Sequence, residues 1–189
     1  MKGRWTVAMT CAALLWAPAV SAQDDFQAKL RAGVQRLQFL KGDWRGCLRN
    51  ADKAGGWGVG TATAGHFRPS LNDLYLETEM VSGRYRYIMV FSYDHAQGRY
   101  RIASRDDQSG LIDIYEGDFG ADGALVLSNL SSGTHYAYKG VKYFNRMTFT
   151  PASDGWSVIV EASSDMGASW KSQTRFDAWR GATGSLASC

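Results

Sequence analysis

The stretch YRYIMVFSYDHAQGRYRIASR, residues 85–105, decides the fold. Its first nine residues place aromatic or soft side chains at every second position, namely Tyr85, Tyr87, Met89, Phe91 and Tyr93. This period of two is typical of a β-strand with one face against a core. After a turn over residues 94–98 the pattern returns, with Tyr100 and Ile102 opposed to arginines. We therefore expect an antiparallel hairpin.

The same alternation continues on both sides of this hairpin, interrupted by short turns that contain Gly, Asn and Asp. It predicts about ten strands, near residues 43–49, 58–67, 73–81, 85–93, 99–105, 111–118, 124–128, 134–150 with a break inside it, 156–163 and 169–179. Hairpin links join sequential neighbours, and a long meander with open edges invites aggregation. We predict an all-β fold, an antiparallel up-and-down β-barrel of about ten strands, with a two-sheet sandwich as the alternative.

One helix is expected before the strands. Phe26, Leu30, Val34, Leu37 and Leu40 recur at helical spacing, which predicts an amphipathic helix. Asp24 or Asp25 is suited to cap its start.

Residues 1–22 have the parts of a cleavable secretory signal, with a basic tip, an apolar stretch over residues 7–20, and small residues before Gln23. The expected product is one domain, residues 23–189, in the periplasm or outside the cell. Removing the signal leaves 19 basic and 18 acidic residues, a near-neutral balance that makes nucleic acid an unexpected partner. No later segment has the roughly 20 apolar residues of a membrane-spanning helix.

Two cysteines remain in the expected mature chain, Cys47 near its start and Cys189 at its end. An oxidising compartment permits a bridge between them. Two free thiols are the alternative, and the sequence leaves both open.

Two elements at opposite ends of the domain suggest a contact between them. Gly42-Asp43-Trp44 opens the first strand and Arg180 follows the last. A guanidinium stacked on an indole gains about 1 kcal/mol where water is excluded, and we expect Trp44 and Arg180 to form this structural pair. The arrangement resembles the signature of lipocalins and their calycin relatives.

More of the chain is similar to a bacterial lipocalin-like family known as domain of unknown function 1579. The similar motifs are Phe39-Leu40-x-Gly42-x-Trp44-x-Gly46, Ser92-Tyr93-Asp94-x-x-x-Gly98-x-Tyr100, Asp106-Asp107 and the closing Arg180. The resemblance implies a lipocalin-like barrel of unassigned function, and it supplies no catalytic residues.

The aromatic strand pair motivates the first functional hypothesis, a non-enzymatic barrel that binds a small apolar or amphipathic ligand. The residues expected to line its pocket are Tyr85, Tyr87, Phe91 and Tyr100, with His66 and Arg105 as polar partners. The alternative is that the same aromatic side chains fill a solid core.

The second hypothesis is an enzyme with an acid or base in the barrel mouth, such as an isomerase, cyclase or hydrolase, with His66 and Arg105 as candidates. No nucleophile elbow, zinc motif or phosphate loop supports it.

We predict no metal and no cofactor. Haem is not expected, because lipocalin-like barrels that bind haem carry their histidine late in the chain and none follows His135.

The segment Ser163-x-Asp165-x-Gly167-x-Ser169-Trp170 resembles an Asp-box, a structural hairpin turn. Asp165 is expected to bond backbone N–H groups of its own turn, with Trp170 packed beneath.

The third hypothesis is a structural or interaction role in the cell envelope, motivated by tryptophans such as Trp57 in a glycine-rich stretch.

Overall fold

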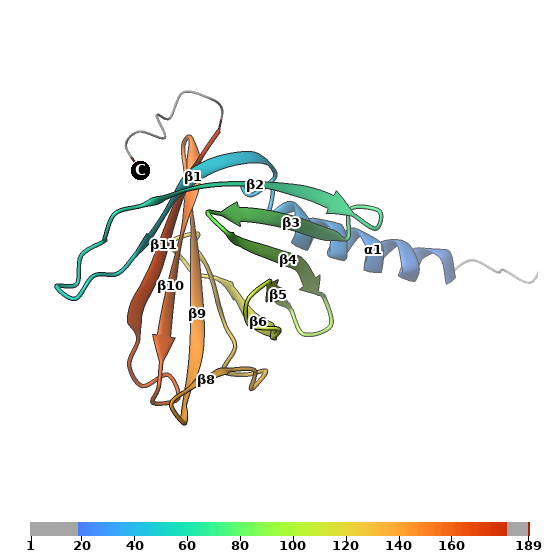
Figure 1. Cartoon of the computed structure of the whole chain (residues 1–189). Coiled ribbons are helices and arrows are strands. Elements are labelled where there is room, and N and C mark those ends of the chain that lie inside the picture. Colours follow the sequence, from blue (N-terminus) through green and yellow to red (C-terminus); the bar gives the residue numbers. More distant parts are fainter. Residues whose placement is uncertain (1–18, 181–188) are drawn as a thin grey trace, which may run out of the picture.

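The computed structural model describes residues 19–180 and Cys189, so the predicted signal of residues 1–22 lies mostly outside the described residues. One helix is followed by eleven strands (Figure 1). These are α1 (Ala19–Gln35), β1 (Gly42–Asn50), β2 (Thr61–Ser70), β3 (Tyr75–Ser82), β4 (Tyr85–Asp94), β5 (Arg99–Asp106), β6 (Ile112–Phe119), β7 (Leu125–Ser128), β8 (Tyr136–Tyr138), β9 (Val141–Ala152), β10 (Gly155–Ser163) and β11 (Lys171–Trp179).

Ten of the strands form a closed antiparallel barrel. From β1 to β7 each strand pairs with the next, β9 pairs with both β7 and β10, and β11 pairs with β1. The predicted up-and-down barrel is confirmed, and the sandwich alternative is wrong. Closure gives each of the ten barrel strands a paired neighbour on both sides, which explains how so long a meander avoids edge-to-edge association.

The remaining strand, β8, arises from the break expected inside residues 134–150. The chain turns at Lys139 and Gly140, which have φ of 51° and 79°, and β8 pairs with β9 alone. Figure 1 shows this short hairpin at the end of the barrel far from α1.

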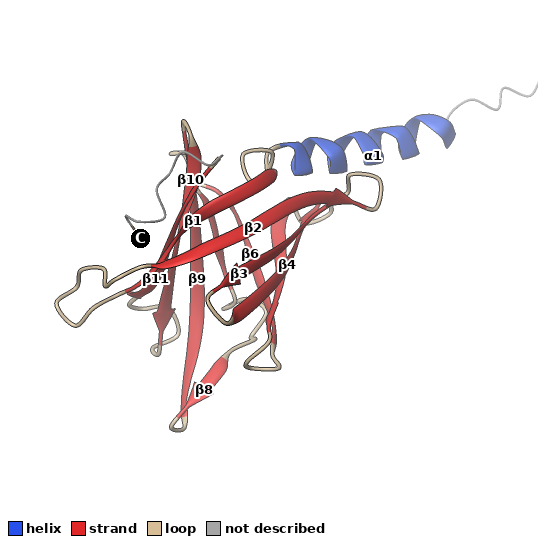
Figure 2. Cartoon of the chain, turned by 45° about the horizontal axis from the view of Figure 1, so that its top comes forward, coloured by secondary structure: helices blue, strands red, loops and turns tan. Residues whose placement is uncertain are grey.

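The helix differs from its prediction at the start. The chain is already helical at Ala19, the first described residue, so Asp24 and Asp25 lie inside the helix and do not cap it. It then continues from residue 36 to residue 40 as tight turns, as in the 2.9 Å bond from Leu37 N to Val34 O. Figure 2 shows the helix leaning out from the end of the barrel where β1 begins, so mainly its last turns contact the barrel.

The close approach of α1 to the barrel depends on Gly33. A Cβ at this position would lie 2.2 Å from the ring of Tyr93. The Tyr100 hydroxyl on β5 donates a 2.9 Å hydrogen bond to the Gly33 carbonyl. Val34 and Leu37 follow and are buried. The chain before β1 therefore closes this end of the barrel.

Below this closure the barrel interior is solid. Phe67, Phe91, Phe149 and Trp156 form a ring of aromatic side chains with centroids 5.5 to 6.0 Å apart. Each of the four is at most 2% exposed. Mutually tilted rings at these separations pack favourably, so this part of the barrel is a conventional core.

Two contacts tie the C-terminal part of the chain to β1. The Arg180 guanidinium lies 4.9 Å from the centroid of the Trp44 ring and donates a 3.3 Å hydrogen bond to the Lys41 carbonyl. Cys189 forms a disulfide with Cys47, with their Cα atoms 5.5 Å apart. The disulfide lies on the outer side of β1, because Trp44 and Leu48 share the opposite, inward face.

In the part of the chain that the structure describes, no helix has the length and apolar character needed to cross a membrane.

A cavity in the barrel as the candidate functional site

Beyond the aromatic core the barrel is hollow. A cavity of about 370 Å³ occupies the half farther from α1, a volume within the usual range of small-molecule sites. Its lining residues come from nearly every strand: Leu48, Met80, Tyr87, Met89, Ser104, Asp106, Ser109, Leu111, Asp113, Tyr115, Tyr136, Asn145, Met147, Phe149, Trp156, Val158, Val160, Thr174 and Phe176. Ser109 and Leu111 belong to the β5–β6 turn and are exposed, so the cavity opens at this end.

The deep part of the cavity is apolar. Phe149, Trp156 and Phe176 belong both to its lining and to the aromatic core, so they form its floor. Methionines project from three strands around it, Met80 from β3, Met89 from β4 and Met147 from β9. Unbranched thioether side chains adapt to ligands of different shape. This half of the cavity suits a hydrocarbon or aromatic group.

One polar atom accompanies this apolar floor. Trp156 is 2% exposed, and its indole nitrogen has no hydrogen-bond partner among the described residues. A buried N–H without an acceptor costs about 1–3 kcal/mol. The nitrogen itself is fully buried, so this cost is borne within the aromatic core.

The mouth of the cavity is polar and carries two carboxylates on adjacent strands. Asp106 ends β5 and Asp113 lies near the start of β6, where it pairs with Ser104. The Asp106 carboxylate already accepts hydrogen bonds from the backbone N–H groups of Gln108 and Ser109, at 2.7 and 2.6 Å. It therefore shapes the β5–β6 turn and adds a negative charge at the mouth.

Asp113 is less engaged than Asp106. Its Oδ2 accepts a 3.3 Å hydrogen bond from the Tyr115 hydroxyl. That hydroxyl in turn lies 3.5 Å from the side-chain nitrogen of Asn145, which donates to it. No basic residue is bonded to Asp113 within the described range. Its charge is thus available to a molecule in the cavity.

Three tyrosines at the cavity remain protonated at neutral pH. Burial, reinforced by the charge of Asp106, raises the pKa of Tyr87. Burial together with Asp113 raises the pKa of Tyr115. Burial is also the main reason why the pKa of Tyr136 is raised. All three hydroxyls therefore act as neutral hydrogen-bond donors or acceptors, and none is poised as a base.

The aromatic residues selected from the sequence separate into two groups. Tyr87 lines the cavity. Phe91 and Tyr100 are 1% exposed and lie in the packed core. Tyr85 shares the face of Tyr87 at the start of β4, where the Arg84 guanidinium lies 5.3 Å from its ring centroid. The structure thus brings one of the four to the cavity.

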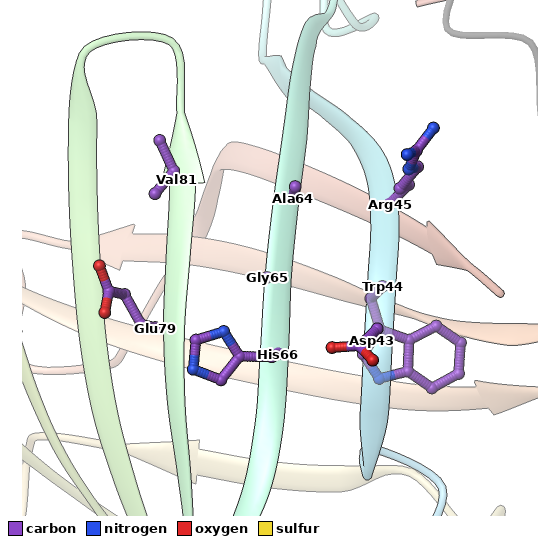
Figure 3. Close-up of a pocket in the computed structure, with 8 residues that line it drawn as sticks. All are labelled: Asp43, Trp44, Arg45, Ala64, Gly65, His66, Glu79 and Val81. Carbon is purple, nitrogen blue, oxygen red and sulfur yellow. The ribbon is translucent and has the colours of Figure 1, made fainter. Parts of the chain in front are cut away.

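His66 and Arg105, the polar candidates, lie on the outer surface. Figure 3 shows His66 on β2 between Asp43 on β1 and Glu79 on β3, its register partners in the ladders. These side chains border a surface hollow over Ala64 and Gly65. Arg105 is exposed and pairs with Ile88 and Ile112. Neither residue reaches the interior, because strand residues of this parity point outward.

The charged groups around His66 are engaged in surface ion pairs. Asp43 bonds Arg68, and Glu79 contacts Arg86 at 3.1 Å. Among the described residues, no three His, Cys, Asp or Glu side chains are grouped to hold a metal ion.

Asp165 organises the β10–β11 turn and lies outside the cavity. It accepts hydrogen bonds from the Ser163 hydroxyl at 2.7 Å and the Ser169 backbone N–H at 2.9 Å. These bonds, with Ser163 first, lower the pKa of Asp165 to about 2. Trp170 packs against Arg146, whose guanidinium lies 4.6 Å from the ring centroid.

Sequence reasoning overlooked most of the cavity. The strand alternation in the sequence places the three methionines, Trp156 and Asp113 at inward-facing positions. This alternation was the available signal. The missing information was depth, because alternation says which face a residue occupies but not whether that level of the barrel is filled.

Comparisons with known proteins define the class of molecule. The chain belongs to the family described as "Protein of unknown function (DUF1579)", whose model matches residues 31–180. Among curated proteins, none matches the chain.

The solved structure of Rv2717c supports the fold. The crystal structure of Rv2717c from M. tuberculosis has a TM-score of 0.59 at 14% identity, covering 79% of this chain and 97% of that one. A protein with unknown function from the DUF3598 family of Nostoc punctiforme PCC 73102 has a TM-score of 0.25 at 8% identity, covering 78% and 98%. At these identities the likeness to Rv2717c concerns the fold alone.

Proposed function

We propose that this protein is an exported lipocalin-like barrel that binds a small apolar or amphipathic molecule. The observation that carries the proposal is the 370 Å³ cavity between the aromatic core and the open end of the barrel. Protein interiors are normally packed to crystal-like density. A hollow of this size, lined by methionines and aromatic rings, is the usual form of a ligand site.

Polar side chains at the mouth also support a ligand. The mouth supplies directional contacts from Ser104, Tyr87 and Asn145. A few polar groups in a mainly apolar pocket fix the orientation of a bound molecule. This arrangement favours an amphipathic ligand over a pure hydrocarbon.

The test is binding of the neutral dye N-phenyl-1-naphthylamine, whose fluorescence rises in apolar surroundings. Val160→Trp on β10 places a larger side chain in the cavity and should abolish the dye signal. The matched control is Ile159→Trp at the next position, which faces outward and should keep wild-type binding. Equal binding by the two folded variants would rule out the cavity as the dye site.

Native mass spectrometry of protein from its own host provides an independent test. We expect an added mass that organic extraction removes and that Val160→Trp lacks. A bare mass for the wild-type protein, together with no dye binding, would refute the carrier role.

The export component rests on the sequence of residues 1–22. N-terminal sequencing of protein from the cell envelope or medium should begin at Gln23. Recovery of the uncut chain from the cytoplasm would contradict it.

A further inference from the structure

The charges around the cavity indicate what kind of head group its ligand carries. Two aspartates, Asp106 and Asp113, line the mouth. Among the described residues that line the cavity, none is a lysine, arginine or histidine. A carboxylate or sulfate head group would therefore meet negative charge with no compensating cation, and repulsion of this kind excludes anionic ligands.

Three arginines near this end of the barrel point away from the cavity. Arg84, on the β3–β4 turn, stacks on Tyr85 and donates a 3.3 Å hydrogen bond to its hydroxyl. Arg86 pairs with Glu79 on the outer face, and Arg105 is also outside. None of these three lines the cavity.

Aromatic rings add a second attraction for a cation. Tyr87, Tyr115 and Tyr136 line the cavity in its polar half, and each has a raised pKa that keeps it neutral. Neutral aromatic faces attract ammonium groups, most strongly where water is excluded. Carboxylate and ring face are the two features that recognise alkylammonium groups.

We propose that the cavity selects cationic amphiphiles, with an amine or quaternary ammonium group at Asp113 and an apolar tail among Met80, Met89 and Met147. This inference rests on the proposed function and specifies its ligand class. Asp113 is the principal contact because its carboxylate has one long hydrogen bond, whereas Asp106 is committed to its turn.

The experiment compares three ligands that share a dodecyl chain and differ in head group. Dodecyltrimethylammonium, dodecanol and dodecyl sulfate each compete with N-phenyl-1-naphthylamine, below their micelle concentrations. Because the dye is neutral, its own binding reports the cavity independently of charge. We expect the ammonium compound to bind about tenfold more tightly than the sulfate, with the alcohol between them.

Asp113→Asn keeps the shape of the side chain and removes its charge. The affinity for the ammonium compound should fall by about fivefold, and the affinity for the alcohol should stay unchanged. The matched control is Asp73→Asn in the β2–β3 turn at the opposite end of the barrel. Asp73 has φ of 63°, which asparagine tolerates, so this variant changes the net charge equally without touching the cavity.

The outcomes separate the two proposals. Equal affinity for all three ligands, or tighter binding of the sulfate, would overturn the charge selection while the ligand cavity stands. Equal loss in Asp113→Asn and Asp73→Asn would show an effect of net charge and would also overturn it. Failure of the dye and all three ligands to bind would refute the proposed function itself.

Discussion

The disulfide between Cys47 and Cys189 offers a quantitative test of barrel closure. Cys189→Ser removes the bond and leaves the ten strands unchanged. A cross-link stabilises a protein mainly by restricting its unfolded chain, and the effect grows with the length of the closed loop. Here the bonded residues are 142 positions apart, for which loop entropy alone gives about 5 kcal/mol.

The expected loss is smaller, because the folded barrel already brings the two ends together. Across the β1–β11 ladder Cys47 faces Asp177. In the folded protein the bond therefore closes only the 12 residues from Asp177 to Cys189. The entropic cost of closing a loop varies as (3/2)RT ln n, where n is the number of residues in the loop. The bond stabilises the fold by the difference between the costs for the long and the short loop. Their lengths differ by a factor of about 12, which gives about 2 kcal/mol. For a domain of this size that corresponds to a decrease in Tm of roughly 4–8 °C.

Urea denaturation of the wild-type protein and Cys189→Ser, with and without dithiothreitol, measures the difference. The wild-type protein in reductant should match the variant, and the variant should not respond to reductant. A loss close to 5 kcal/mol would mean that β11 does not close the folded barrel against β1. An unchanged free energy of unfolding would mean that the two cysteines are not bonded.

Three further predictions concern single contacts. Tyr100→Phe removes the hydrogen bond to the Gly33 carbonyl and should lower the free energy of unfolding by about 1 kcal/mol, as measured by urea denaturation; no change would show that the bond does not hold α1. Arg180→Met removes the guanidinium from the Trp44 ring and should lower the free energy of unfolding by about 0.5–1 kcal/mol in the same assay. If Arg180→Lys lowers it by as much, the loss of positive charge is not its cause. The pKa of Asp165 is lowered from 3.8 to about 2 in the folded protein. Its carboxylate therefore stabilises the fold at pH values above the pKa of the unfolded chain, and this contribution disappears as the pH falls through about 2. The stability difference between the wild-type protein and Asp165→Asn should therefore be constant above roughly pH 5 and vanish near pH 2, and a difference that persists at the lowest pH would refute this assignment.

The fold was accessible from the sequence because one physical pattern runs through it. Side chains alternate between a solvent-exposed and a buried face along almost the whole chain, and the turns between the strands are short. In residues 85–105 this pattern correctly gave both strands and the turn. The start of α1 could not be placed, because Asp24 and Asp25 are good caps by residue type and yet lie inside a longer helix.

The candidate site was less accessible, for a geometric reason. Tyr87 and Phe91 occupy the same face of β4 four positions apart, yet one lines a cavity and the other is 1% exposed in the core. Their difference depends on what α1 and the facing strands place at each level of the barrel. His66 and Arg105 were selected by chemical type, but their position in the alternation puts them outside.

The proposal of a ligand cavity is tested most directly by NMR of protein labelled with ¹³C at the methionine methyl groups. Met80, Met89 and Met147 line the cavity, whereas Met166 lies on the β10–β11 turn and is 68% exposed. On titration with N-phenyl-1-naphthylamine, the first three methyl signals should shift together with a common affinity and the Met166 signal should stay in place. A shift confined to Met166, or none at any of the four, would contradict a ligand cavity inside the barrel.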